Sequence, residues 1–382
     1  MNQRWARVVL VVVTALLAAG LSGRAASAGP PPDVEGLPGD LRLNQVQMIG
    51  SHNSYHLEPR EPLASAIRLF DPAGLEQIQY SHSPLPTQFG SEFVRQIELD
   101  VFADSVGGRY ATPVGGEVNG DDPADRPEMF EPGMKVLHIQ DIDHETTCTT
   151  LVRCLTQAEQ WSDANPDHSP IAVLIETKDS PIPDPTGLGF VVPEPFTADR
   201  LDELDAEIRS VLDPGDLITP DDVRGGAVTL EQAVLSTGWP TLADSRGKFI
   251  FLYNNGGQDR VRYLTGHPSL AGRVMFTNAS PGDDDAAFVM RNDPGTGNAA
   301  QASAAASEIQ NLVAAGYVVR TRSDVPTFQA RSGDTARRDQ ALASGAQWVS
   351  TDYPVQNRAL NRFGTDYYAA LPEGNPIRCN PV

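Results

Sequence analysis

Short apolar runs alternate with helical patterns along most of this sequence, and this alternation limits the possible folds more than any other feature. Runs rich in Val, Ile, Leu and Phe, bounded by polar or turn-forming residues, predict strands. Between several of them, apolar residues recur at the spacing of an amphipathic helix. Strands that alternate with helices form a parallel sheet. The predicted strands are residues 45–49, 95–102, 135–139, 171–176, 249–253, 273–277, 317–320 and 347–350.

The number of strands favours a closed (β/α)8 barrel of the TIM type with long loop insertions. Helices are predicted at residues 149–164, 197–212, 302–315 and 334–343. No linker or abrupt change of composition divides the chain, so one α/β domain accounts for the pattern better than two. Apolar residues make up 40% of the sequence, which is enough for such a core. In a barrel of this kind, the loops that follow the strands build the active site.

The first 28 residues are expected to be a secretory signal and not part of the fold. Arg4 and Arg7 precede an apolar run of residues 8–21, and Ala26-Ser27-Ala28 matches the small-residue pattern that signal peptidase cleaves. The run is shorter than the roughly 20 residues that span a bilayer. We therefore expect cleavage after Ala28 and a single secreted domain over residues 29–382. We also expect the protein to be a monomer.

Charge and cysteine content narrow the possible partners. The formal net charge of −21 repels the phosphates of nucleic acids, so no nucleic acid partner is expected. Export permits cysteine oxidation, and the three cysteines allow one bridge within the chain. Cys148 and Cys154 are the natural pair, although a bridge from Cys154 to Cys379 is also possible. Neither their number nor their spacing resembles a zinc site.

Carboxylates at the ends of two predicted strands indicate a cation site. Glu98 and Asp100 are two residues apart, so their side chains share one face of the strand while the apolar neighbours face the other way. Buried carboxylates need a compensating charge. A hard ion that prefers oxygen ligands, Ca²⁺ before Mg²⁺, is the simplest candidate. Glu176 and the amide oxygen of Asn53 would complete the protein ligands.

Several of these segments match a known family in order. GSHNSY at residues 50–55, ELD at 98–100, VLH at 136–138 and LIE at 174–176 closely resemble the catalytic half of the calcium-dependent phosphoinositide-specific phospholipases C, in particular their secreted bacterial relatives. The segment WVSTDYP at residues 348–354 also resembles the last barrel strand of the bacterial enzymes. Residues 180–274 give no detailed match.

The resemblance implies a reaction and a set of site residues. The expected activity is cleavage of phosphatidylinositol, or of a related soluble inositol or glycerol phosphodiester, by attack of the inositol 2-hydroxyl, which gives diacylglycerol and a cyclic inositol phosphate. His52 and His138 would flank the scissile bond and move protons, since an imidazole titrates near neutral pH. The expected calcium ligands are Asn53, Glu98, Asp100 and Glu176, and the expected phosphate or inositol contacts are Lys178, Arg320 and Arg322.

Two alternatives and one difficulty remain open from the sequence. A glycerophosphodiester phosphodiesterase shares the barrel and the Glu-x-Asp pair, but such enzymes usually have His-Arg where this chain has His52-Asn53. A non-catalytic barrel that binds calcium and lipid headgroups would normally have lost a histidine or a carboxylate. The acidic net charge opposes contact with an anionic membrane, so any such contact is expected to be transient. The other five histidines lie in loop-like contexts and are expected at the surface.

Overall fold

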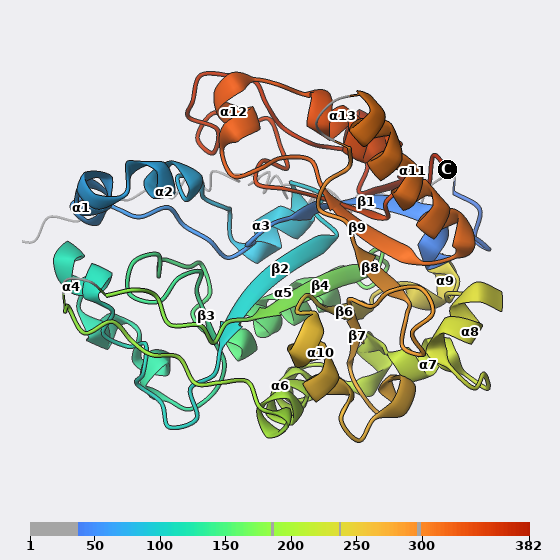
Figure 1. The fold of residues 1–382 in the computed structure, drawn as a ribbon, viewed down its shortest axis with the longest axis horizontal. Helices are drawn as coiled ribbons and strands as arrows, with labels where there is room; N and C mark the ends of the chain where they lie inside the picture. The colour runs from blue at the N-terminus through green and yellow to red at the C-terminus, as the bar shows by residue number, and fades with distance from the viewer. Residues whose placement is uncertain (1–36, 185–186, 237, 296–298) are drawn as a thin grey trace, which may run out of the picture.

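The computed structural model describes residues 37–184, 187–236, 238–295 and 299–382. Its sheet follows the order β5-β6-β4-β2-β1-β10-β9-β8, with β3, β7 and β11 paired outside this path (Figure 1). The strands are β1 Val46–Ser51, β2 Gln96–Phe102, β3 Lys135–Val136, β4 Ile171–Thr177, β5 Leu217–Ile218, β6 Phe249–Tyr253, β7 Met275–Thr277, β8 Phe288–Met290, β9 Val318–Arg322, β10 Trp348–Thr351 and β11 Ile377–Cys379.

The parallel strands curl into an irregular barrel. β1 lies between β2 and β10, and β6 pairs with β4 on one edge and with β7 on the other. A single bridge between Asn278 and Phe288 links the end of β7 to β8 within the described residues. The other neighbouring strands of the ring pair directly, although β1 and β2 do so at one residue pair, Gly50 and Gln96, and the predicted TIM-type α/β fold is confirmed.

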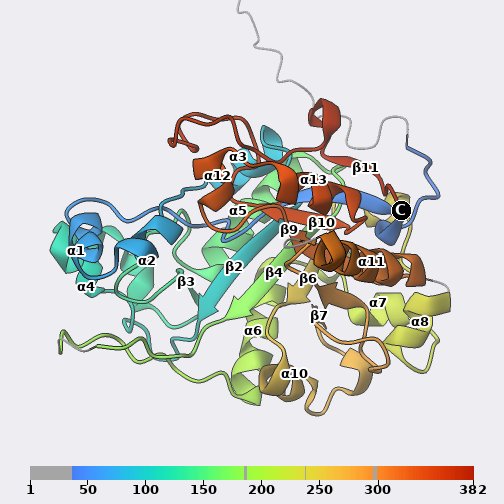
Figure 2. The same ribbon diagram turned by 45° about the horizontal axis from the view of Figure 1, so that its top comes forward.

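Helices and extra turns cover the outside of the sheet (Figures 1 and 2). In both views α1, α2 and α4 gather at one end of the molecule and α7 and α8 at the other. The helices are α1 Leu63–Phe70, α2 Pro72–Gln77, α3 Leu85–Gly90, α4 Val114–Asn119, α5 Leu151–Ala164, α6 Ala198–Val211, α7 Pro220–Arg224, α8 Leu230–Ser236, α9 Leu242–Ser245, α10 Gly257–Leu264, α11 Ala299–Ala315, α12 Phe328–Ser332 and α13 Ala336–Ala343.

The two longest strands explain why the carboxylates are held so firmly. β2 and β4 pair in parallel along six residues, from Gln96 opposite Ala172 to Val101 opposite Thr177. Every residue of β2 is buried, and so is every residue of β4 except Glu176. Ile97, Leu99 and Val101 belong to the main apolar core, which leaves the alternate residues for the other face, as the alternation predicts.

Two details of the predicted strand order are wrong. The predicted third strand contributes only β3, which runs antiparallel to the end of β2, while β4 pairs directly with β2. The long apolar runs of β2 and β4 form a continuous parallel ladder. In residues 135–139 only Lys135 and Val136 form a strand, and the chain then turns at Asp141, whose φ is +68°. The eighth barrel strand is β8, a three-residue segment that is not among the predicted strands.

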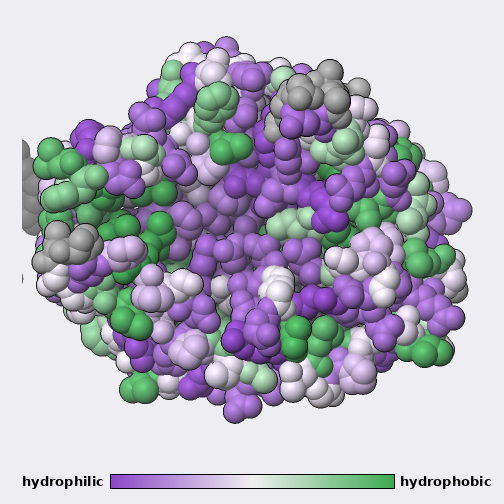
Figure 3. Space-filling view, viewed as in Figure 1, coloured by the Kyte–Doolittle hydropathy of each residue, from purple (hydrophilic) through white to green (hydrophobic). Residues whose placement is uncertain are grey.

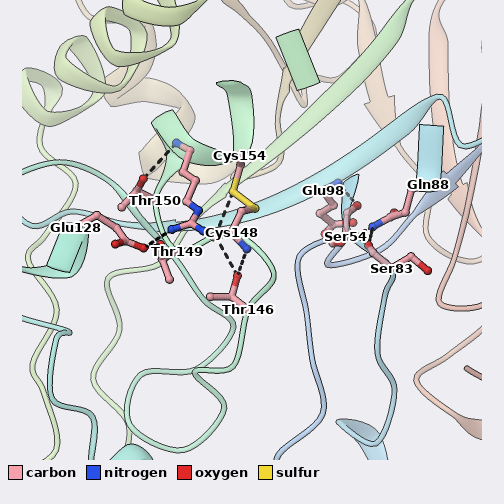
Figure 4. The surroundings of a disulfide bond; sticks show 11 residues. Ser54, Ser83, Gln88, Glu98, Glu128, Thr146, Cys148, Thr149, Thr150 and Cys154 are labelled. Atoms are coloured by element: carbon pink, nitrogen blue, oxygen red, sulfur yellow. Dashed lines mark hydrogen bonds and ion pairs between the residues drawn. A yellow bond between two sulfur atoms is a disulfide. The ribbon is translucent and has the colours of Figure 1, made fainter. Parts of the chain in front are cut away.

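A disulfide bond joins Cys148 to Cys154 at the start of α5 (Figure 4). Thr150 caps this helix, because its side-chain oxygen accepts a hydrogen bond from the Arg153 amide. Cys379 is exposed and has a free thiol. Of the two pairings that the sequence left open, the structure has Cys148 with Cys154.

The predicted signal over residues 1–28 lies outside the described residues. Among the residues that the structure describes, no helix has both the length and the apolar character needed to cross a bilayer.

Candidate active site

Three carboxylates meet at the carboxyl ends of β2 and β4. Asp100 on β2 lies directly opposite Glu176 on β4, and Glu98 lies one pair earlier on the same face. One carboxylate oxygen from each residue lies within 4.8 Å of the other two. Glu98 and Asp100 are buried, while Glu176 is partly exposed. The strands therefore bring together the three acidic residues that the sequence predicts as calcium ligands.

Asn53 lies in a tight turn after β1, and the backbone of this turn contacts β2 at Glu98. Its φ is +45°, in the left-handed region, and the turn is tied to β2 because the Ser54 amide donates to the Glu98 carbonyl at 2.9 Å. The Ser54 hydroxyl in turn accepts from the Glu98 amide at 2.8 Å. The Asn53 side-chain nitrogen donates to the Tyr80 hydroxyl, so the amide oxygen is its group for binding a cation.

The chemistry of this donor set fits a hard divalent ion. Both carboxylate oxygens of Asp100 are buried; one of them lies 3.1 Å from Lys178 Nζ, and the other has no hydrogen-bond partner among the described residues. Burial raises the pKa of Asp100 well above its usual value, even though Lys178 opposes the shift. Burial also raises the pKa of Glu98. Ca²⁺ satisfies clustered carboxylates and buried oxygens that lack donors, so the three carboxylates and the unpaired Asp100 oxygen fit the predicted ion.

Two of the predicted substrate-binding cations contact the carboxylates in this structure. Lys178 Nζ lies 3.1 Å from an Asp100 oxygen and 2.6 Å from a Glu176 oxygen. A guanidinium nitrogen of Arg320 lies 2.5 Å from a Glu98 oxygen. Although burial lowers it, the charges of Asp100 and Glu176 raise the pKa of Lys178. Lys178 and Arg320 are thus within reach of the same ion-binding cluster.

His52 follows β1 and forms a pair with a carboxylate that the sequence analysis did not select. Its Nδ1 lies 2.9 Å from an oxygen of Asp352, which follows β10. A carboxylate accepts, so the proton sits on Nδ1 and the lone pair on Nε2. Burial, and then the charges of Arg322 and Arg320, lower the pKa of His52 well below its usual value. His52 is therefore an uncharged imidazole with one nitrogen available to accept a proton.

Arg322, the third predicted cation, holds the other side of this pair. Its guanidinium lies 3.2 Å from the second oxygen of Asp352 and 3.6 Å from Asp324. The Asp352 amide donates to Asp324 at 3.1 Å. The carboxylate of Asp352 is consequently fixed between an imidazole and a guanidinium.

His138 is oriented by a second carboxylate, which it shares with another histidine. His138 Nδ1 donates to Asp143 at 2.6 Å, and His56 Nε2 lies 2.9 Å from the same carboxylate. His56 Nδ1 lies 3.0 Å from the Tyr80 carbonyl oxygen. Both ring nitrogens of His56 thus face acceptors, which indicates a doubly protonated ring.

The pKa shifts agree with this charge assignment. Although burial lowers it, Asp143 raises the pKa of His56. Although burial raises it, His56 and His138 lower the pKa of Asp143. A buried imidazolium therefore balances the charge of the carboxylate that orients His138.

Aromatic rings connect the two histidine–carboxylate pairs. The Tyr80 ring centroid lies 6.2 Å from that of His52 and stacks 4.3 Å from that of His56. The His56 ring lies 5.5 Å from that of His138 in an edge-on arrangement. The prediction of surface histidines is wrong for His56, His82, His144 and His168, which are all buried, because loops that cross the ends of the barrel are packed against one another.

A cleft of about 400 Å³ opens beside this arrangement, and its lining includes His138, Glu176 and Lys178. The centre of this face of the molecule is hollowed and hydrophilic (Figure 3). The side chain of His138 is 21% exposed and that of His52 is 14% exposed, so both can be reached from solvent.

Sequence reasoning missed the groups that orient the histidines. Asp352 lies within the matched segment at residues 348–354, and its position after the last strand was a usable signal. Asp143 and His56 lie in irregular loops with no periodic pattern, so only the fold places them beside His138. Asn254, which follows β6 and donates to Glu176, was also missed.

Comparisons with known proteins identify the family and similar folds. A family model described as Phosphoinositide phospholipase C, Ca²⁺-dependent matches residues 41–381. A search of curated proteins gives no match. Among solved structures, a Ca²⁺-dependent phosphatidylinositol-specific phospholipase C from Streptomyces antibioticus is 18% identical with a TM-score of 0.52, covering 90% of this chain and all of that one. A calcium-dependent phosphoinositol-specific phospholipase C from a Pseudomonas species, in a myoinositol complex, is 17% identical with a TM-score of 0.50, covering 89% and 96%.

Proposed function

This chain belongs to the Ca²⁺-dependent phosphoinositide phospholipase C family, and from that premise we propose how its own residues cleave phosphatidylinositol. The protein is a calcium-dependent phosphodiesterase of the phospholipase C type. In our proposal the inositol 2-hydroxyl attacks phosphorus, the bond to the glycerol oxygen breaks, and the products are diacylglycerol and inositol 1,2-cyclic phosphate. The observation that supports this most directly is the pair of carboxylate-oriented histidines beside the three-carboxylate cluster.

We assign the proton transfers to the two histidines. His52 accepts the proton of the attacking hydroxyl at Nε2, while Asp352 and Arg322 hold the ring in the required tautomer. His138, which lines the open cleft, donates a proton to the leaving glycerol oxygen and is recharged from solvent. The proton count of the reaction balances, because His52 removes one proton and His138 supplies one.

Asn53, Glu98, Asp100 and Glu176 are the proposed ligands of the calcium ion. When bound there, the ion supplies positive charge that lowers the pKa of a nearby hydroxyl and stabilises the phosphorane oxygens. Lys178 and Arg320, which contact the carboxylates in this structure, would turn to the substrate phosphate or the inositol hydroxyls. We assign Arg322 to holding Asp352 and not to binding substrate. Its guanidinium contacts one carboxylate oxygen of Asp352, while His52 contacts the other.

The identity of the products tests this reaction against the glycerophosphodiesterase alternative. We expect glycerophosphoinositol to yield glycerol and inositol cyclic phosphate in calcium, detectable by phosphorus NMR, and glycerophosphocholine to remain intact. EDTA should abolish turnover. Release of glycerol 3-phosphate from either substrate, or turnover that EDTA leaves unchanged, would show that the chemistry is not that of a phospholipase C.

We further propose that the carboxyl end of α1 contacts the lipid surface. Leu69 and Phe70 are 83% and 81% exposed, and apolar side chains gather over α1 at the left of Figure 3. The helix lies in the connection between β1 and β2, which leaves the barrel at the same end as His52. Two exposed apolar side chains can insert into a bilayer despite the acidic net charge.

Replacing Leu69 and Phe70 together by aspartate should lower the rate on phosphatidylinositol vesicles by about 30-fold or more, since each lost apolar side chain removes roughly 1–2 kcal/mol of membrane binding. Cleavage of soluble glycerophosphoinositol should stay unchanged. The matched control replaces Val228 and Leu235, which are exposed at the opposite end of the molecule. Equal losses in the two double variants would contradict a specific role for α1.

Export, a single domain over residues 29–382 and a monomeric state complete the proposal. The disulfide between Cys148 and Cys154 supports export, because such bonds persist in oxidising compartments.

A further inference from the structure

A second cluster of potential metal ligands lies outside the proposed calcium site. His144 is buried, and neither of its ring nitrogens has a hydrogen-bond partner among the described residues. Its Nε2 lies 3.7 Å from an oxygen of Asp121 and 3.7 Å from an oxygen of Glu145. A buried imidazole without partners requires an explanation, because native proteins satisfy almost all such groups.

The spacing of these atoms suits a small divalent ion. One ligand atom from each of Asp121, His144 and Glu145 lies within 4.8 Å of the other two. Ligands that each bind an ion at about 2.1 Å lie roughly 3–4 Å from one another in a tetrahedral site. A nitrogen ligand favours ions of the zinc class over Ca²⁺, which prefers oxygen.

In this structure the guanidinium of Arg60 supplies the positive charge between the two carboxylates of the cluster. Its guanidinium lies 2.7 Å from Asp121 and 2.6 Å from Glu145, and so holds the two carboxylates together. The Arg60 side chain is 53% exposed, so it can leave at little cost. Arg126 lies 3.4 Å from the Asp121 oxygen that faces His144. The guanidinium of Arg60 bonds to the two carboxylates, while both ring nitrogens of His144 are left without a hydrogen-bond partner among the described residues.

The cluster is accessible and separate from the calcium ligands. A cleft of about 270 Å³ is lined in part by Asp121 and Arg126. Asp121 follows α4, and His144 and Glu145 lie between β3 and α5, whereas the proposed calcium ligands follow or belong to β1, β2 and β4. We propose that Asp121, His144 and Glu145 form a second metal site that binds a divalent ion of the zinc class in exchange for the Arg60 side chain.

Zinc titration of the purified protein tests the proposal directly. The Cys379→Ser background removes the exposed thiol, and saturating calcium occupies the oxygen site. Isothermal titration with Zn²⁺ should show one fewer site in His144→Ala than in the background protein, while His267→Ala, a partly buried histidine elsewhere, should keep the full number. The comparison also accounts for any zinc held by His56, His138 and Asp143, because these residues are the same in every variant.

Arg60→Ala separates a metal site from a purely structural ion-pair cluster. Loss of the competing guanidinium should tighten zinc binding by several-fold and increase the rise in Tm that zinc produces. Weaker zinc binding in Arg60→Ala, or a stoichiometry that His144→Ala leaves unchanged, would overturn the proposal. Far-ultraviolet circular dichroism of each variant without zinc verifies that it is folded, and anomalous diffraction at the zinc edge in background crystals should place the ion between the three side chains.

Discussion

Replacing His138 by alanine is expected to lower kcat on phosphatidylinositol by roughly two to four orders of magnitude, since the variant has no group to protonate the leaving glycerol oxygen. His52→Ala should show a loss of similar size, because the attacking hydroxyl then lacks its base. Stopped or continuous assays of inositol cyclic phosphate release measure both effects. His267→Ala, which changes a histidine outside this site, is the control and should retain the full rate.

The leaving group distinguishes the two histidines. The nitrophenolate of a nitrophenyl inositol phosphate departs without protonation. The His138→Ala variant should therefore cleave this substrate about 100-fold faster than it cleaves the glycerol ester. His52→Ala should recover little, because the nucleophile still needs a base. Equal recovery in both variants would reverse or remove the assigned roles, while full activity of either variant on phosphatidylinositol would exclude that histidine from proton transfer.

Asp100→Asn is expected to change calcium binding and stability in opposite directions. Loss of a charged ligand should raise the calcium concentration for half-maximal activity by about tenfold or more. Without calcium, the same change should stabilise the fold by roughly 1–3 kcal/mol, because burial and the nearby charges of Glu176 and Glu98 outweigh the ion pair of Asp100 with Lys178, and the change replaces this carboxylate by a neutral group. Calcium titrations of activity and thermal unfolding in EDTA measure the two effects.

The pH dependence of this gain follows from the raised pKa of Asp100. A carboxyl group with a pKa higher in the folded than in the unfolded protein binds more protons when folded, so calcium-free stability falls as pH rises through that interval. The advantage of Asp100→Asn should therefore be greatest at neutral pH and disappear in acid, where Asp100 is protonated. A variant that is less stable than the parent at neutral pH in EDTA would show that the ion pair with Lys178 outweighs the cost of burying the Asp100 carboxylate.

A buried carboxylate with full partners provides the matched control. Asp205 accepts from the Tyr263 hydroxyl at 2.7 Å and contacts Arg273 at 3.4 Å. Asp205→Asn should lower stability in the presence and absence of calcium alike, because it weakens satisfied interactions. Its calcium requirement should match that of the parent protein.

Local sequence patterns were sufficient to predict a large part of the fold. The continuous apolar runs that became β2 and β4 could be recognised because parallel strands are buried on both faces. The starts of α5 and α6 could also be recognised, since Thr150 and Thr197 cap them. β8 escaped recognition because three residues are too few to show a period, and β3 was assigned the wrong direction because sequence does not specify the partner of a short strand.

The sequence by itself determined which side chains end the barrel strands, because alternation along β2 places Glu98 and Asp100 on one face whatever surrounds them. Only the tertiary structure decided which groups orient the histidines. Asp352 is 300 residues from His52, and Asp143 meets His56 across 87 residues. Such contacts depend on how loops cross the end of a closed sheet, and no local propensity encodes that path. The same reason explains why His56 and His144 are buried although their neighbours along the chain predicted the surface.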